Sequence, residues 1–348
     1  MGLGIDSLNG SVMQDGDDDR SSKRSVKRRV GFVLGLLLLC AAAIYLITDP
    51  SALREFADHI SHAPLWATLL VLLGPILNLL FVSQCLWALN RRHGQIERLE
   101  MLMLVGSAWL LNHLPMRPGL VGRIGYHAKV NKIRVRDSVE ASIWSAIHAA
   151  IANAIGLGLA LLMSPTIGMG QFTLLLASPL VLLLILTVLA ETKSDQLGLL
   201  MRALIWRYAD LLVWMLRYAA AFAMLGVHIT PVQIALITAV SQIAQIIPIT
   251  GGGLGFREWG VGLTATMTPG IQGIAMRTAV GADVINRIAE TIIVIPVGLV
   301  CTALVARRFK AVMKQRAFEQ GSAEDQPVGH PQDQDQPGQP GQQYPPDH

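Results

Sequence analysis

Long apolar runs, almost free of charge, recur along most of the chain. Crossing a bilayer as an α-helix takes about 20 mostly apolar residues, and a transmembrane barrel would show alternating segments of about ten instead. The pattern therefore predicts an all-α, polytopic transmembrane bundle of about six full spans. The runs near or above that length are 30–47, 64–89, 139–163, 172–190, 208–226 and 279–305.

Two further apolar segments do not fit simple spans. Residues 101–114 form too short a run, and 231–268 is interrupted by Pro248 and the glycines at 251–253. Because proline removes a backbone donor and glycine permits unusual dihedral angles, a helix is expected to stop at such a break. We therefore expect each segment to turn back on itself.

Basic clusters set the expected orientation, because loops rich in Lys and Arg stay in the cytoplasm. Segment 101–114 has basic residues on both flanks, so it should enter from the cytoplasm and return there. Basic residues follow span 279–305, so this span should end inside and start outside. Segment 231–268 precedes it and should therefore enter from the outer side and return there. The sequence thus predicts an inner or plasma membrane protein with both termini cytoplasmic and two re-entrant hairpins. The basic clusters are 23–29, 91–98, 117–136 and 307–316.

Composition supports this assignment and divides the chain. Only 15% of residues are charged and the mean hydropathy is +0.46, whereas soluble domains carry about 25% charged residues. The net charge of +4 indicates loops facing anionic headgroups rather than a nucleic-acid partner. We expect a polar cytoplasmic segment at 1–29, a transmembrane domain at 30–316, and a disordered Pro/Gln-rich cytoplasmic tail at 317–348.

The two interruptions resemble each other. Each has an apolar residue and a proline, then glycine, then arginine. Paired Pro/Gly breaks in the two halves of a membrane protein indicate an internal repeat around a central site, and opposite entry sides would make the repeat inverted. The alternative is that both are ordinary tight turns that are alike by chance. The residues are Pro115, Arg117, Gly119 and Arg123 in the first break, and Pro248, Gly251, Gly252, Gly253, Gly255 and Arg257 in the second.

A phosphate is the ligand that these breaks would suit. A helix restarting after Gly255 offers free N–H groups and the positive end of its dipole, with Arg257 beside them. Arg117 and Arg123 could bind phosphate from the other side, because guanidinium pairs with phosphate in a bidentate manner. Glu258 would either pair with Arg257 or occupy the helix start, where a carboxylate is favoured; we prefer the second role.

The last span carries four polar residues, Asp283, Asn286, Arg287 and Glu290, whose spacing places them on one helical face. Charges inside a span normally face the bundle interior or a cavity. They could line a translocation path, with Arg287 available to a headgroup phosphate. They could equally form an internal ion-pair cluster of Asp283, Arg287 and Glu290 that only fixes packing.

At the two breaks the chain resembles the lysylphosphatidylglycerol synthase transmembrane-region family, also called flippase-like membrane proteins. The likeness rests on Asn112-x-x-Pro115-x-Arg117-x-Gly119 followed by Arg123. It rests equally on Pro248-x-x-Gly251-Gly252-Gly253-Leu254-Gly255-x-Arg257-Glu258. The resemblance implies a membrane domain that moves phospholipids or lipid-linked headgroups across the cytoplasmic membrane. Because only the polar tail follows residue 316, we expect this chain to lack the soluble aminoacyltransferase domain of bifunctional relatives.

Three functions are therefore weighed. A lipid transporter, which we favour, would bind membrane lipids and need no cofactor or metal. A membrane enzyme acting on a lipid phosphate or polyprenyl-linked sugar would need a base or metal-binding carboxylates. A non-catalytic partner would recruit a lipid-modifying enzyme. The lipid, the coupling ion and the oligomeric state stay open. For the enzyme, the available acidic residues are Asp137, Glu140, Asp283 and Glu290.

Overall fold

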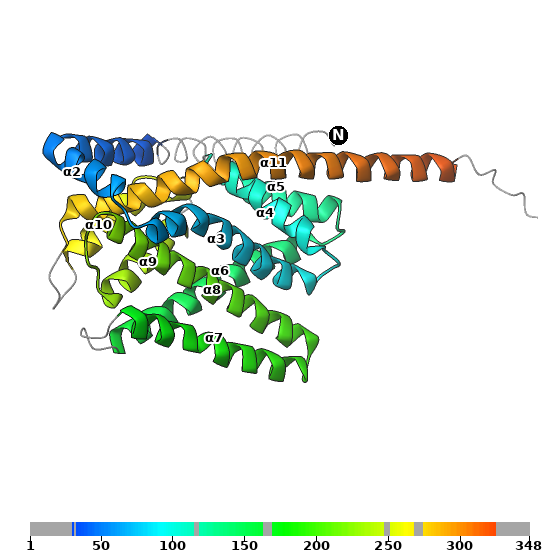
Figure 1. Ribbon diagram of the computed structural model, residues 1–348. Helices are drawn as coiled ribbons and strands as arrows, with labels where there is room; N and C mark the ends of the chain where they lie inside the picture. The colour runs from blue at the N-terminus through cyan, green and yellow to red at the C-terminus, as the bar shows by residue number, and fades with distance from the viewer. Residues whose placement is uncertain are drawn as a thin grey trace, which may run out of the picture. The chain divides into compact units, whose positions relative to one another are not determined.

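A computed structural model describes residues 30, 33–114, 118–162, 169–246, 251–267 and 274–324, and every regular element in these ranges is helical (Figure 1). The predicted all-α class is confirmed for this part of the chain. The elements are a helix at Val33–Ile47, α2 (Pro50–Ser61), α3 (Leu65–Arg91), α4 (Arg98–Asn112), α5 (Pro118–Lys129), α6 (Val135–Leu162), α7 (Met169–Glu191), α8 (Asp195–Met224), α9 (Pro231–Ile246), the 3₁₀ turn η1 (Gly251–Gly253), α10 (Phe256–Thr266) and α11 (Met276–Glu324).

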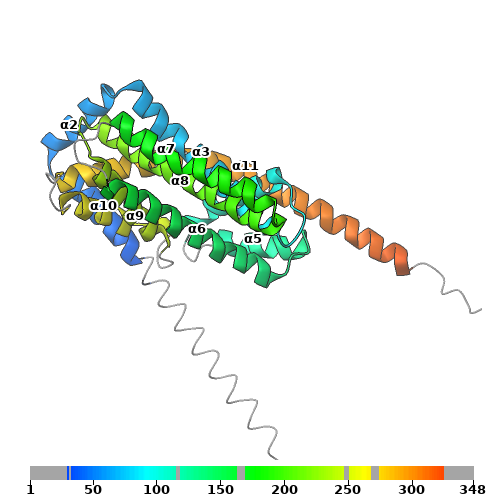
Figure 2. The same cartoon turned by 90° about the horizontal axis from the view of Figure 1, so that it is seen from below.

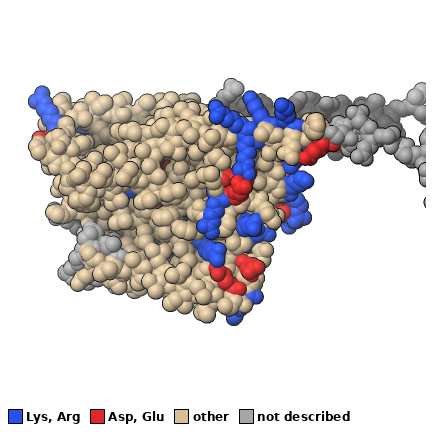
Figure 3. Space-filling model, turned by 45° about the vertical axis from the view of Figure 1, so that its right-hand side comes forward, with Lys and Arg blue, Asp and Glu red and all other residues tan. Residues whose placement is uncertain are grey.

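The helices have the character of a membrane protein. Among the described residues, α3, α6, α7 and α11 are long and apolar enough to cross a bilayer. Figure 3 shows a broad face almost free of charged side chains, and most of the Lys, Arg, Asp and Glu side chains in view gather toward one end. The predicted span 208–226 overlaps α8, which ends at Met224, and α8 is outside this apolar set. Helix Val33–Ile47 is apolar but shorter than a span over its described residues.

The core of the bundle is an antiparallel pair formed by α3 and α8. Gly74 lies against Arg217, Asn78 bonds Asp210, and Arg92 Nε donates to Gln196 Oε1 at 3.0 Å, so positions rise along α3 as they fall along α8. Aromatic side chains of α8 fill the interior beside this contact, and the hydroxyl of Tyr208 donates to the carbonyl of Leu176 in α7 at 2.8 Å. The buried face of α8 therefore carries both the core and its charges.

Segment 231–268 forms a helical hairpin, whereas segment 101–114 is the single helix α4 and forms a hairpin only with the α5 that follows it. In the first, α4 packs on α5, and Gly119 lies so close to the carbonyl of Ala108 that a Cβ would have no room. In the second, α9 packs on α10 through η1, and Gly252 and Gly253 have φ angles of 61° and 75°. Because these angles disfavour residues with a Cβ, the break between α9 and α10 depends on glycine.

The order of elements around the hairpins occurs twice. Helices α3, α4, α5 and α6 have 27, 15, 12 and 28 residues, while α8, α9 and α10 have 30, 16 and 11 and are followed by the long α11. Each hairpin begins just after one member of the antiparallel α3/α8 pair ends. The hairpins are therefore at opposite ends of that pair, as Figures 1 and 2 also show.

Local sequence explains where the second hairpin starts. Thr230 and Gln233 cap α9 reciprocally: Thr230 N–H donates to Gln233 Oε1 at 3.0 Å, and Gln233 N–H donates to Thr230 Oγ1 at 3.4 Å. Pro231 is the first helical residue, where its missing N–H costs nothing. The start of the hairpin is thus fixed by three neighbouring residues.

The chain divides into two compact units, residues 1–307 and 308–348. Helix α11 continues to Glu324. Residues 317–324 were predicted to belong to the disordered tail, and they are helical instead. Residues 1–29 and 325–348 lie outside the described part, as do the break residues Pro115, Arg117 and Pro248.

Candidate functional site

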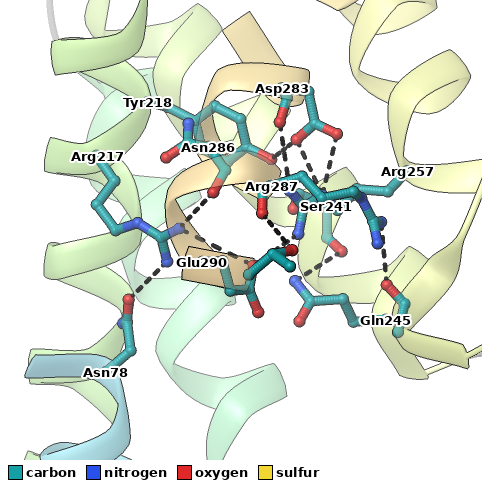
Figure 4. A network of polar contacts seen from close by, with 12 residues as sticks. Asn78, Arg217, Tyr218, Ser241, Gln245, Arg257, Asp283, Asn286, Arg287 and Glu290 are labelled. Carbon is teal, nitrogen blue, oxygen red and sulfur yellow. Dashed lines mark hydrogen bonds and ion pairs between the residues drawn. The ribbon is translucent and has the colours of Figure 1, made fainter. Parts of the chain in front are cut away.

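A buried network of charged side chains lies where α3, α8, α10 and α11 meet (Figure 4). Its charged members come from three helices: Arg217 from α8, Arg257 and Glu258 from α10, and Asp283, Arg287 and Glu290 from α11. The polar face predicted for the last span does point into this network. The four helices thus bring together the second break and the charges of the last span.

Arg257 is the centre of the network. It is the second residue of α10, directly after the break, and only 1% exposed. Its Nε donates to Asp283 Oδ1 and Oδ2 at 2.9 and 3.0 Å, and its Nη1 donates to Glu290 Oε2 at 3.2 Å. The hydroxyl of Tyr218 donates to Asp283 Oδ1 at 2.6 Å. The guanidinium is therefore held between two carboxylates.

Arg217 extends the network across the bundle and is fully buried. It donates to Asn78 Oδ1 at 2.9 Å and to the carbonyl of Asn286 at 3.2 Å, and its guanidinium lies over the Trp214 ring at 4.3 Å. Its aliphatic stem crosses α3 at Gly74, where a Cβ would approach Cγ and Cδ to 2.5 Å. Glycine at this position is what lets an arginine pass between two tightly packed helices.

Arg287 and Glu258 form a second ion pair beside the break, with 2.5 Å between Nε and Oε1. Arg287 Nη2 also donates to the carbonyl of Gly252 at 3.2 Å. The predicted ion pairing among Asp283, Arg287 and Glu290 is therefore wrong, because Asp283 and Glu290 both contact Arg257. The alternative Arg257–Glu258 pair is absent from the described contacts. Glu258 does lie in the first turn of α10, as preferred.

Charge within the network is balanced, since its three arginines face three carboxylates. A buried ion without a partner costs several kcal/mol, which explains why every charge here has an opposite neighbour. The polar groups are not all satisfied, however. Arg217 Nε and both amide atoms of Asn286 have no hydrogen-bond partner among the described residues. Buried polar atoms of this kind are normally satisfied by water or a ligand, so the network has the polarity of a hydrated site.

A line of polar side chains continues along α8 away from the network. Asn78 Nδ2 donates to Asp210 Oδ1 at 2.6 Å, and Arg207 Nη1 donates to Asp210 Oδ2 at 2.9 Å. Asp210 is buried and paired with both of these residues. Asn78 and Tyr218 are the members that sequence reasoning missed. The only signal for Asn78 was an amide within an otherwise apolar run.

Arg123 does not join the arginines of the second break. It is buried in α5 and its Nη2 donates to Ser142 Oγ of α6 at 2.9 Å. Arg207, the member of the polar line that influences Arg123 electrostatically, is ten residues and so about 15 Å along α8 from Arg217. The structure therefore brings together Arg257, Glu258, Asp283, Arg287, Glu290 and Gly252, while Arg123 lies in the other hairpin.

The remaining predicted site residues are placed as follows. Gly253 packs against the carbonyl of Ala244, and Gly255, with φ at 79°, packs against helix Val33–Ile47. Gly251 begins η1, and Arg117 lies outside the described residues. Asp137, a carboxylate considered for an enzyme, is held by Arg134 at 2.9 and 3.1 Å.

Comparison of the chain with protein-family models, with curated proteins and with solved structures finds no match. The membrane character and the helical fold consequently rest on the chain's own sequence and structure, and the family resemblance remains an expectation.

Proposed function

We propose that this protein is an integral membrane lipid translocase, which moves a phospholipid or a lipid-linked headgroup between leaflets. The observation that carries the proposal is the buried, charge-balanced network beside a glycine break between helices. Charges in the middle of a membrane protein are costly and usually mark the path of a polar substrate. Irregular backbone at such a depth is tolerated only inside protein or beside a water-filled cavity.

The arrangement of the hairpins supports a transport mechanism. Two hairpins at opposite ends of the α3/α8 pair are what an inverted repeat would give, with each hairpin entering from one leaflet. In our proposal the two halves rock against each other and expose the network to one leaflet at a time. A headgroup phosphate is bound by arginines that release their carboxylates, while the acyl chains stay in lipid.

The orientation proposed is a plasma membrane protein whose basic end and two termini all face the cytoplasm. Arg136 at the start of α6 and Lys193 between α7 and α8 belong to the basic end, whereas Arg54 in α2 and His228 before α9 belong to the other. Single cysteines at Arg136 and Lys193, in a chain carrying Cys40→Ser, should react with an impermeant thiol reagent from the cytoplasmic side only. Cysteines at Arg54 and His228 should react from the outer side only. Labelling of Arg136 and His228 from one side would exclude the inverted arrangement.

Transport itself is tested in reconstituted vesicles that carry fluorescent phospholipids with anionic or zwitterionic headgroups. Replacing Arg287→Gln together with Glu258→Gln removes one ion pair of the network without leaving a buried charge unpaired. We expect the transfer rate to fall at least about tenfold, which corresponds to about 1.4 kcal/mol in the barrier.

A matched pair outside the network provides the control. Arg202 Nε lies 2.6 Å from Glu191 Oε1, and both side chains are partly exposed at the basic end. The double variant Arg202→Gln, Glu191→Gln should transfer lipid at the wild-type rate. If the Arg287/Glu258 variant is folded and also transfers lipid at that rate, the network is not the transport site.

A further inference from the structure

An apolar groove runs between helix Val33–Ile47 and α11. It has a volume of about 830 Å³, within the range of about 300–1,000 Å³ typical of ligand sites. Leu39, Ala43 and Leu46 line one side, and Ile288 and Ile292 line the other. The two isoleucines are 54% and 55% exposed, so the groove opens on the apolar outer surface of the bundle. Hydrocarbon, rather than water, is the medium that this surface fits.

Arg287 is the one charged residue in the wall of this groove, among the described residues that line it. Its Nε points to Glu258 and its Nη2 to the carbonyl of Gly252, both at the break. Among the described residues its Nη1 has no partner, and that nitrogen can donate two hydrogen bonds. Arg287 already pairs with Glu258, and its remaining N–H groups can bind a further acceptor such as a phosphate oxygen.

The groove and the buried network therefore meet at one side chain. Glu258, the partner of Arg287, is fully buried on the network side, whereas the side chain of Arg287 is 13% exposed. An anion that reaches Arg287 from the groove would stand near the start of α10, where the helix dipole favours negative charge. The geometry joins an apolar channel of lipid size to an anion-binding helix end.

We infer that this groove is a lateral entry site for a glycerophospholipid, with one acyl chain between helix Val33–Ile47 and α11 and the phosphate on Arg287. The inference rests on the proposed function and specifies the substrate class that would enter the network. The apolar lining and the exposure of the groove to the bilayer favour an acyl chain. The single arginine in its lining favours a phosphate at the head of that chain.

Lipid retention measures this site without any transfer step. The full chain would be reconstituted in vesicles of phosphatidylglycerol, phosphatidylcholine and diacylglycerol, extracted in mild detergent, and weighed by native mass spectrometry. We expect one phospholipid to stay bound, with diacylglycerol retained at least about tenfold less because it lacks the phosphate. Equal retention of diacylglycerol would overturn the role of Arg287.

Two tryptophan variants test the position of the lipid. Ala43→Trp fills the groove and should lower phospholipid retention at least about tenfold. Ala150→Trp, at an exposed position of α6 outside the groove, should leave retention unchanged. Unchanged retention in Ala43→Trp would overturn the site. A lipid-free dimer that Ala43→Trp dissociates would also overturn the site, because the groove would then bind a second copy of the chain. A gain in lipid retention on deleting residues 1–29 would overturn it too, because the groove would then bind that segment.

The result is separable from the proposed function. If the protein retains phospholipid in the groove but transfers none, the entry site stands and the translocase function is contradicted. If the protein transfers lipid but retains none, and Ala43→Trp transfers lipid at the normal rate, only the entry site is contradicted.

Discussion

Replacing Arg257 by alanine is expected to lower the free energy of unfolding by about 3–5 kcal/mol, the cost of breaking a buried ion pair by removing one partner. Arg257 is 1% exposed and contacts both Asp283 and Glu290. Its loss leaves Asp283 facing only Tyr218 and leaves Glu290 with Arg217 at 3.9 Å. Denaturant unfolding in detergent micelles, followed by circular dichroism, would measure the change.

A charge-neutral double variant separates stability from function. Arg257→Gln with Asp283→Asn removes one positive and one negative charge together, and the new amide oxygen on α11 can still accept from the Tyr218 hydroxyl. We expect most of the lost stability to return, while lipid transfer stays below about a tenth of the wild-type rate. If Arg257→Ala alone proves as stable as the wild type, the buried ion pairs do not exist as described.

Replacing Gly255 by alanine should have the second largest effect. Gly255 has a φ angle of 79°, and a Cβ there would meet the Leu38 side chain and lie 2.7 Å from the Gly35 carbonyl oxygen. The left-handed backbone costs about 1–2 kcal/mol for a residue with a Cβ. Overpacking adds about 1–3 kcal/mol, because the obstacle includes backbone. We expect a loss of about 2–5 kcal/mol in the free energy of unfolding.

Gly158 gives the matched comparison, since a Cβ there meets nothing within 4 Å and the residue lies inside α6. Gly158→Ala should stabilise the protein by about 0.5–1 kcal/mol, because alanine loses less backbone entropy in a helix. Equal melting temperatures for the two variants would mean that helix Val33–Ile47 does not pack on the break.

The helices and their breaks could be predicted from the sequence because both depend on local patterns. Residues 64–89 and 139–163 are apolar enough to define α3 and α6, and the glycines at 251–253 define the break before α10. The charged face of α11 followed from helical spacing alone, because residues three or four positions apart lie above one another. These features need no knowledge of neighbouring helices.

The pairing of charges could not be predicted, because it depends on how helices are rotated against each other. Arg257 and Glu258 are adjacent in sequence but about 100° apart around α10, so they reach different residues of α11. Arg217 reaches Asn78 only because Gly74 leaves space on another helix. The predicted convergence of both hairpins on one pocket failed at Arg123 for the same reason, because Arg123 of α5 donates to Ser142 of the neighbouring α6.

The contact between the first described helix and the second break has a consequence for biogenesis. The Leu38 carbonyl accepts from Trp259 Nε1 at 3.0 Å across 221 positions of sequence. During synthesis the N-terminal helix reaches the membrane long before α10 exists, so it must wait without its final neighbour. Closure of the second half is then a late event, and a nascent chain stalled before residue 255 would present an uncovered apolar surface to insertases and quality-control proteases.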